Sequence, residues 1–128
     1  MVESDIRVSS GINVRGETRL FYIPEGTIEI RELQVDANSP DYIIEINHRR
    51  GVIRLDYSDF SGIDTDEFYA GSPSSGVYRI WVKRLLLDAP ITITVIPKTG
   101  VIAVKFFIKY ERKNTVKFFA KYERIGKK

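Results

Sequence analysis

The sequence predicts an all-β fold, an antiparallel sandwich of two sheets of the jelly-roll or another Greek-key type. Apolar and polar residues alternate along most of the chain, which is the period of a strand with one buried face. Turn-forming residues recur about every 8–12 residues, and no amphipathic helical pattern is present over residues 1–103. Strands without helices must bury their faces against one another, so a sandwich is favoured, with a closed barrel as the alternative.

Alternating runs in the first half of the chain predict strands at residues 18–23, 28–36, 42–47 and 52–57. The apolar positions change parity between Ile30 and Leu33, as one extra residue in a β-bulge would cause. The segment 48–51 (HRRG) predicts a hairpin turn between the third and fourth of these strands.

Residues 58–76 contain three glycines and show no sustained period. They predict a long loop, and we expect it to be the least ordered internal segment. Alternation returns at 77–83, an apolar run at 85–87 ends at Asp88, and residues 91–96 (ITITVI) predict a further strand.

The end of the chain contains an internal repeat. Residues 104–112 (VKFFIKYER) recur as residues 116–124 (VKFFAKYER), with eight of nine positions identical. Residues 1–103 are therefore expected to form a sandwich body. Residues 104–128 are expected to form a basic hairpin packed on the same domain or on a neighbouring subunit. In the register that keeps the faces matched, the opposed pairs are Phe106 with Ala120, Ile108 with Phe118, and Tyr110 with Val116. A helical conformation of this segment is the alternative.

The apolar face of that hairpin is the predicted interface of a homo-oligomer, made of Val104, Phe106, Ile108, Tyr110, Val116, Phe118 and Tyr122. The other face interleaves lysines with aromatic rings: Lys105, Phe107, Lys109, Lys117, Phe119 and Lys121. Such a face is a candidate contact for single-stranded nucleic acid or for an acidic protein partner, and lysines on strands also protect exposed edges from aggregation. Nucleic acid is the less favoured partner, because its footprint usually includes a basic domain.

The charge is distributed unevenly. Residues 1–103 carry eleven Lys and Arg against fifteen Asp and Glu, a net charge of −4, and residues 104–128 carry nine against two, a net charge of +7. An acidic body and a basic end favour association between copies of the chain or with an acidic partner.

Two groups of residues surround the segment 58–76. Five carboxylates are weak candidates for a calcium site, although their spacing is not that of an EF-hand: Asp56, Asp59, Asp64, Asp66 and Glu67. Aromatic side chains that could stack on sugars are Tyr57, Phe60, Phe68, Tyr69, Tyr78 and Trp81. They suggest a carbohydrate-binding module, although a strand tryptophan such as Trp81 is more commonly part of a core.

Catalytic chemistry is poorly represented in the sequence. The absence of cysteine excludes disulfides, thiolate metal sites and cysteine nucleophiles. The single histidine, His48, falls in a hairpin turn without a neighbouring nucleophile, and no phosphate-loop, Rossmann, serine-hydrolase or zinc-protease motif occurs. We therefore expect no enzyme, no catalytic residues and no cofactor other than the calcium considered above.

The segments 20–30 and 33–42 resemble small β-sandwich proteins of virions, such as the tail, neck, fibre and decoration proteins of bacterial and archaeal viruses. There a strand ends in a Val/Ile-Pro-x-Gly turn and a long strand follows, as at residues 23–26 (IPEG) here. The resemblance covers about residues 18–57, brings no catalytic residues, and implies a structural role beside other virion proteins.

Three classes of function follow: a non-enzymatic structural or assembly protein, which the sequence favours, a module that binds carbohydrate or another ligand through residues 58–76, and a nucleic-acid-binding protein. The start of the sequence shows no signal-peptide core and no apolar run reaches the roughly 18–20 residues of a membrane span. A virion or a host cytoplasm is thus expected rather than secretion or a membrane. The scarcity of heat-labile residues beside abundant charge suggests a thermophilic source.

Overall fold

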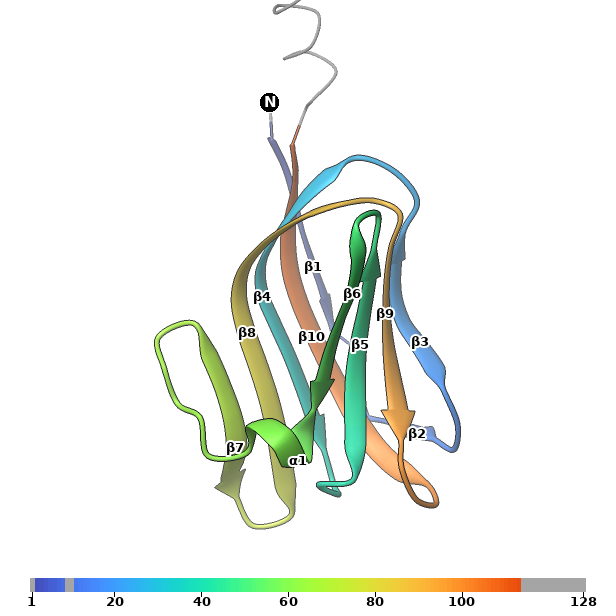
Figure 1. The fold of residues 1–128 in the computed structure, drawn as a ribbon, viewed down its shortest axis with the longest axis vertical. Coiled ribbons are helices and arrows are strands. Elements are labelled where there is room, and N and C mark those ends of the chain that lie inside the picture. Colours follow the sequence, from blue (N-terminus) through green and yellow to red (C-terminus); the bar gives the residue numbers. More distant parts are fainter. Residues whose placement is uncertain (1, 9–10, 114–128) are drawn as a thin grey trace, which may run out of the picture.

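The computed structural model describes residues 2–8 and 11–113, and it confirms the all-β sandwich. Over these residues, ten strands form two antiparallel sheets that pack face to face (Figure 1). Among them, no strand of one sheet pairs with a strand of the other, which distinguishes the sandwich from the closed barrel.

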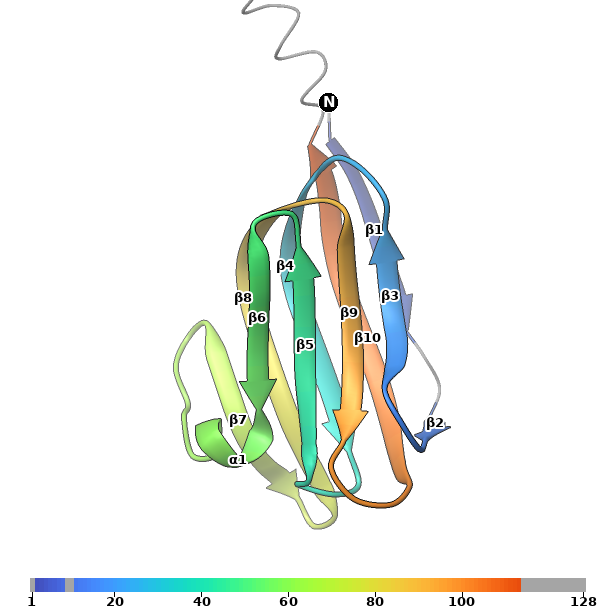
Figure 2. The ribbon, with the colours of Figure 1, turned by 45° about the vertical axis from the view of Figure 1, so that its right-hand side comes forward.

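The larger sheet has six strands in the order β1-β10-β4-β8-β7, with β2 also beside β10. Their bounds are β1 (Val2–Val8), β2 (Ile12–Val14), β4 (Thr27–Ala37), β7 (Phe68–Ser74), β8 (Val77–Asp88) and β10 (Ile102–Lys113). The smaller sheet has four strands in the order β3-β9-β5-β6. Their bounds are β3 (Thr18–Ile23), β5 (Tyr42–His48), β6 (Gly51–Asp56) and β9 (Ile91–Pro97). The turned view in Figure 2 shows the smaller sheet as a separate layer in front of the larger one, and a single helical turn, α1 (Tyr57–Phe60), connects β6 to β7.

The strands predicted from alternation at 18–23, 28–36, 42–47, 52–57, 77–83 and 91–96 are all confirmed to within a few residues at their ends. The hairpin turn is confirmed as well, since His48 pairs with Gly51. Alternation identified these strands because each of them has one face on the core and the other on solvent.

The core lies between the sheets and is filled by alternate residues of both. The β10 residues that face it are Val104, Phe106, Ile108 and Tyr110, each at most 6% exposed. Phe21 of β3 meets Tyr110 edge to face, with ring centroids 5.1 Å apart. The buried hydroxyl of Tyr42 donates to the backbone oxygen of Tyr78 at 2.8 Å, so this phenol is not left unpaired in the core.

The predicted β-bulge is confirmed and lies at Arg31. The pairing of β4 with β10 shifts register between Lys109 and Tyr110, which leaves Arg31 as the extra residue. Leu33 is buried on one side of the bulge and Ile30 on the other, as the change of parity requires.

A second irregularity, on β8, was not predicted. Arg84 falls between the pairs Glu32–Lys83 and Ile30–Leu85, beside the bulge, and has a φ of 61°, in the left-handed region that residues with side chains rarely adopt. The parity of β8 changes there, because Val82 is buried before it and Leu87 after it. The left-handed residue therefore turns the Arg84 side chain out to solvent, at a position where regular alternation would place it in the core.

The prediction that residues 58–76 form one long loop is wrong. The segment contains most of α1 and all of β7, which pairs with the edge of β8. The Asp56 side chain caps α1 by accepting a hydrogen bond from the backbone N–H of Ser58 at 3.0 Å. Phe60 then packs edge to face on Phe68, with ring centroids 5.4 Å apart. Capping and ring packing thus order a segment whose sequence shows no period.

The division at residue 103 does not match the described strands. Residues 104–113 belong to β10, which lies inside the larger sheet between β4 on one side and β1 and β2 on the other. Ile108, for example, is opposite Leu33 on β4 and opposite Arg7 on β1. The predicted hairpin register is therefore wrong for Ile108, because both edges of its strand are already paired. The second copy, residues 116–124, lies outside the described residues.

Candidate functional site

The outer face of the larger sheet carries a row of residues from four neighbouring strands. Tyr69 of β7 is opposite Trp81 of β8, Trp81 is opposite Gln34 of β4, and Gln34 is opposite Phe107 of β10. Paired residues of an antiparallel sheet share a face, so these side chains lie side by side away from the core. The row brings together segments far apart in the sequence.

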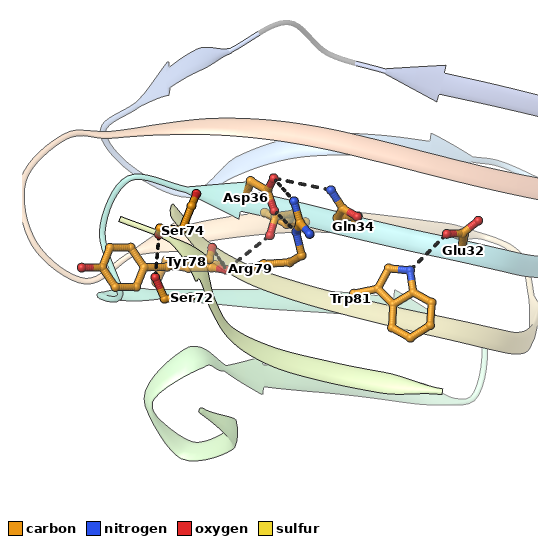
Figure 3. Close-up of polar contacts among 10 residues, drawn as sticks. Glu32, Gln34, Asp36, Ser72, Ser74, Tyr78, Arg79 and Trp81 are labelled. Carbon is orange, nitrogen blue, oxygen red and sulfur yellow. Dashed lines mark hydrogen bonds and ion pairs between the residues drawn. The ribbon is translucent and has the colours of Figure 1, made fainter. Parts of the chain in front are cut away.

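The indole of Trp81 is held in place by two contacts. Its Nε1–H donates to a carboxylate oxygen of Glu32 at 3.1 Å, as Figure 3 shows, and the Nζ of Lys83 lies 5.3 Å from the ring centroid. A charge-assisted hydrogen bond and a cation–π contact both restrict the ring. The half-buried indole is thus presented in a fixed orientation.

A bidentate ion pair lies beside the tryptophan. The Nε and Nη2 of Arg79 donate to the two carboxylate oxygens of Asp36 at 2.7 and 3.0 Å (Figure 3). The pair raises the pKa of Arg79, which therefore stays charged. Gln34 adds a longer contact from its amide nitrogen to Asp36, at 3.4 Å. The amide oxygen of Gln34 and the Nη1 of Arg79 have no such partner among the described residues, so both are available to a ligand.

Tyr69 reaches its position because residue 71 is a glycine. A Cβ at Gly71 would lie 2.9 Å from the Tyr69 hydroxyl oxygen, closer than Cβ atoms come in proteins. The backbone of Gly71 does not need a left-handed conformation, so the approach of the ring is what requires glycine here.

The turn before β7 forms one rim of the site. The Thr65 hydroxyl accepts hydrogen bonds from the backbone N–H groups of Glu67 and Phe68, at 3.3 and 3.0 Å, and donates to the backbone oxygen of Phe68. The backbone N–H of Lys83 donates to the Glu67 oxygen at 2.9 Å. The Thr65 bonds hold the turn together, and the bond from Lys83 attaches it to β8.

These groups surround a hollow of about 320 Å³, at the small end of the roughly 300–1,000 Å³ of ligand pockets. Its lining consists of Gln34, Asp64, Thr65, Tyr69, Pro73, Arg79 and Trp81. The two ionised lining groups, Asp64 and Arg79, have opposite charges. The lining side chains therefore offer aromatic surface and hydrogen-bonding groups and have no net charge among themselves, while Asp36, outside the lining, pairs with Arg79.

The sequence predicted only part of this hollow. Tyr69 and Trp81 were both in the aromatic group, but Trp81 was expected in the core and lies on the outer face. Asp64 was named only as a weak metal candidate, and Gln34, Thr65, Pro73 and Arg79 were missed. The alternation of β8 carried the signal for Trp81, because Trp81 shares its parity with Arg79 and Lys83 and not with the apolar residues between them.

Other members of the predicted aromatic group have structural positions. Tyr57 is buried and stacks on Tyr42, with centroids 5.6 Å apart, and Tyr78 meets Tyr57 edge to face. Phe60 and Phe68 hold α1 against β7. None of these four lines the hollow.

The five carboxylates that the sequence offered as weak calcium candidates are all described, and they do not come together as a site. No three acidic or histidine side chains within the described residues lie together as metal ligands would. Asp56 instead pairs with Lys98 at 2.7 Å, and Glu67 lies 3.8 Å from Arg84. The burial of Asp56 by itself raises the pKa of its carboxyl, but the hydrogen bonds from Lys98 and Ser58 outweigh burial and lower it.

The first copy of the repeat has a different role from the one predicted. Val104, Phe106, Ile108 and Tyr110 are buried in the core of their own domain, so they do not form a surface for another subunit. Their counterparts Val116, Phe118 and Tyr122 lie outside the described residues.

Lys105 and Lys109 are exposed on the outer face, and Phe107 is half-buried between them, as predicted. Lys105 is opposite Asp36 and Lys109 is opposite Glu32, so each lysine has an acid beside it. Their use in binding nucleic acid stays a prediction. Lys117, Phe119 and Lys121 fall outside the described residues.

Neither a protein-family model nor a curated protein matches this chain. Within the described residues, no helix has the length and apolar character needed to cross a membrane.

Proposed function

We propose that the protein is a non-enzymatic binding module that takes an uncharged, polyhydroxylated ligand, a carbohydrate, in the hollow on its larger sheet. The observation that carries the proposal is the pair of aromatic rings, Tyr69 and Trp81, in register on adjacent strands and beside Gln34 and Arg79. Gly71 leaves room for the tyrosine ring, and a hydrogen bond to Glu32 holds the tryptophan.

The chemistry of a sugar matches this surface. A sugar ring has C–H groups that pack on aromatic faces and hydroxyl groups around its edge that need both donors and acceptors. Gln34 supplies an amide oxygen and Arg79 a guanidinium nitrogen next to the rings, while Asp64 supplies a carboxylate at the rim. Because Asp36 already compensates Arg79, the hollow has no excess positive charge for an anionic ligand.

The lining also favours binding over catalysis. Its only hydroxyl nucleophile candidates are Thr65 and Tyr69, and the Thr65 hydroxyl is occupied by three backbone contacts. No histidine lines the hollow, and Asp64 is the only carboxylate of its lining, whereas glycoside hydrolysis uses a pair of carboxylates.

The proposal can be tested by retention on immobilised neutral polysaccharides, namely cellulose, xylan, mannan, starch and galactan. We expect retention on at least one of them and a loss of affinity of about tenfold or more for Trp81→Ala, because a stacking surface is removed. Leu86→Ala is the matched control, since Leu86 is 65% exposed on the same strand outside the hollow. No retention on any of the five polymers, or equal retention of both variants, would contradict the proposal.

A second candidate is the structural or assembly role, as a virion component or another homo-oligomer, and the repeat supports it. The inward-facing side chains of β10 are Val104, Phe106, Ile108 and Tyr110, and we call the place that they fill in the core the slot. The second copy has the same residue types at the matching positions, except that Ala120 stands in place of Ile108. Losing a fully buried isoleucine side chain costs about 2–5 kcal/mol, so the first copy is the better occupant of its own slot. The second copy of another molecule would be the competing occupant.

The assembly role is tested by the mass in solution of the full chain, of a chain without residues 114–128, and of Ala120→Lys. An assembly that uses the slot is expected to dissociate in both variants, because a lysine at the position matching Ile108 could not be buried. Lys117→Gln is the control, since its counterpart Lys105 is exposed. A full chain that is already monomeric would rule this role out.

A further inference from the structure

The hollow has a neighbour on the other side of Trp81. This second, open hollow has a volume of about 860 Å³ and is lined by Thr65, Asp66, Glu67, Trp81, Lys83 and Arg84. Trp81 and Thr65 line both hollows. The indole thus stands between two depressions of one continuous surface.

The two hollows follow the direction of β8. Arg79 lines the first, Trp81 lines both, and Lys83 and Arg84 line the second. From Arg79 to Arg84 a strand advances roughly 16 Å, which is longer than a single sugar ring. A ligand that contacted both ends would have to be a chain.

The charges of the second hollow also balance. Glu67 and Arg84 are 3.8 Å apart and both largely exposed, and Lys83 stands opposite Glu32. With two acids and two bases in its lining, this hollow has no net charge either. One uncharged ligand could therefore occupy both.

The backbone conformation of Arg84 is a second observation, independent of the lining charges, which indicates that the second hollow is a specific feature of the fold. The left-handed φ of 61° costs conformational energy for a residue with a side chain, and it turns Arg84 outward next to Lys83. If β8 alternated regularly, Lys83 would line this hollow and Arg84 would face the core, so the lining would have one base instead of two.

We propose that the two hollows are adjacent subsites of one groove, and that the ligand is a linear neutral oligosaccharide that crosses Trp81 rather than a single sugar. This inference rests on the proposed carbohydrate-binding function. The units on either side of the indole would each bury one part of the ring and contact a different set of polar groups. Affinity should consequently grow with the number of units until both subsites are filled.

The test is calorimetric titration with gluco-, xylo- and manno-oligosaccharides of one to six units. We expect affinity to rise at least tenfold from the single sugar to the tetramer of the series that binds. Arg84→Gly should reduce affinity for the tetramer severalfold and leave that for the single sugar unchanged. Glycine accepts the left-handed φ, so this variant is expected to fold.

Arg54→Ala is the matched control, because Arg54 is an exposed, ion-paired arginine on β6 in the other sheet. If the single sugar binds as tightly as the tetramer, or if Arg84→Gly changes neither affinity, the groove is wrong while carbohydrate binding in the first hollow stands. If no sugar of any length binds, both the groove and the proposed function are wrong.

Discussion

At the scale of single residues, Gly71 and Tyr69 show how an absent side chain can build a binding surface. The Tyr69 hydroxyl oxygen lies only 2.9 Å from where a Cβ on residue 71 would be, so glycine at this position permits the observed placement of the ring. The hydroxyl end of the ring would have to move if any side chain were added. Gly71 therefore affects the shape of the hollow, although it is not one of the lining residues.

Gly71→Ala is expected to displace Tyr69 and to weaken oligosaccharide binding severalfold, with little loss of thermal stability because β7 is an edge strand. Gly16→Ala is the control, since nothing lies within 4 Å of a Cβ there and its φ is not left-handed. The measurements are melting temperature and binding affinity. Unchanged affinity in Gly71→Ala would show that the position of Tyr69 does not matter to the ligand.

Asp56 gives a pH dependence whose sign is fixed by its contacts. The hydrogen bonds from Lys98 and Ser58 lower the pKa of Asp56 in the folded protein. Its contribution to stability is therefore complete above the pKa of the unfolded chain and is lost as the pH falls through the folded value. We expect Asp56→Asn to lower the free energy of unfolding at pH 7 and to make it fall less on acidification.

Urea unfolding at several pH values between neutrality and about pH 3 measures this effect. Asp59→Asn is the comparison, because Asp59 is an exposed residue of the same helical turn. Parallel curves for Asp56→Asn and the unaltered protein would show that the contact with Lys98 does not contribute.

At the scale of elements, β10 illustrates what alternation can and cannot predict. The period of two correctly separated the buried Phe106 and Ile108 from the exposed Lys105 and Lys109. It did not identify the neighbouring strands, since pairing of β10 with β1 and β4 is a contact between distant segments. The predicted hairpin paired the repeat with itself because only local pairing can be read from spacing.

β7 was missed for a related physical reason. It contains Gly71 and Pro73 and lies at the edge of the sheet, where proline is tolerated and one face need not be apolar. Its order comes from pairing with β8 and from the Phe60–Phe68 contact, and neither leaves a period in the sequence. The hollow depends on β7, so the site as a whole could not be predicted although two of its rings were.

Ile108→Ala is expected to lower the free energy of unfolding by about 2–5 kcal/mol, because the side chain is fully buried and its loss leaves a cavity. Lys109→Ala, the exposed neighbour, should change it by about 0.5 kcal/mol at most. Equilibrium unfolding in urea measures both. Similar small effects in the two variants would mean that the first copy of the repeat is not the strand that fills the core.

At the scale of the whole molecule, the inner faces of the sandwich stabilise the fold, and the outer face of the larger sheet carries the proposed binding surface. The inner faces of the two packed sheets (Figure 1) form the core, and the outer face of the larger sheet carries Trp81, Tyr69 and their polar neighbours. A sheet is a rigid base for such a surface, because Trp81 and Gln34 are paired on both sides and Tyr69, on the edge strand, pairs with Trp81. The bulge at Arg31 and the left-handed Arg84 then adjust which side chains face outward.

The most direct measurement uses the fact that Trp81 is the only tryptophan of the chain, so that tryptophan fluorescence reports on the hollow alone. The full chain would be titrated with neutral gluco-, xylo- and manno-oligosaccharides of four to six units while tryptophan emission is recorded. A saturable change in emission with at least one series, shifted to severalfold higher concentrations in Gly71→Ala, is the predicted result. Emission that stays constant with every series would contradict the account, because an oligosaccharide that crosses Trp81 must contact the indole, which lines both hollows.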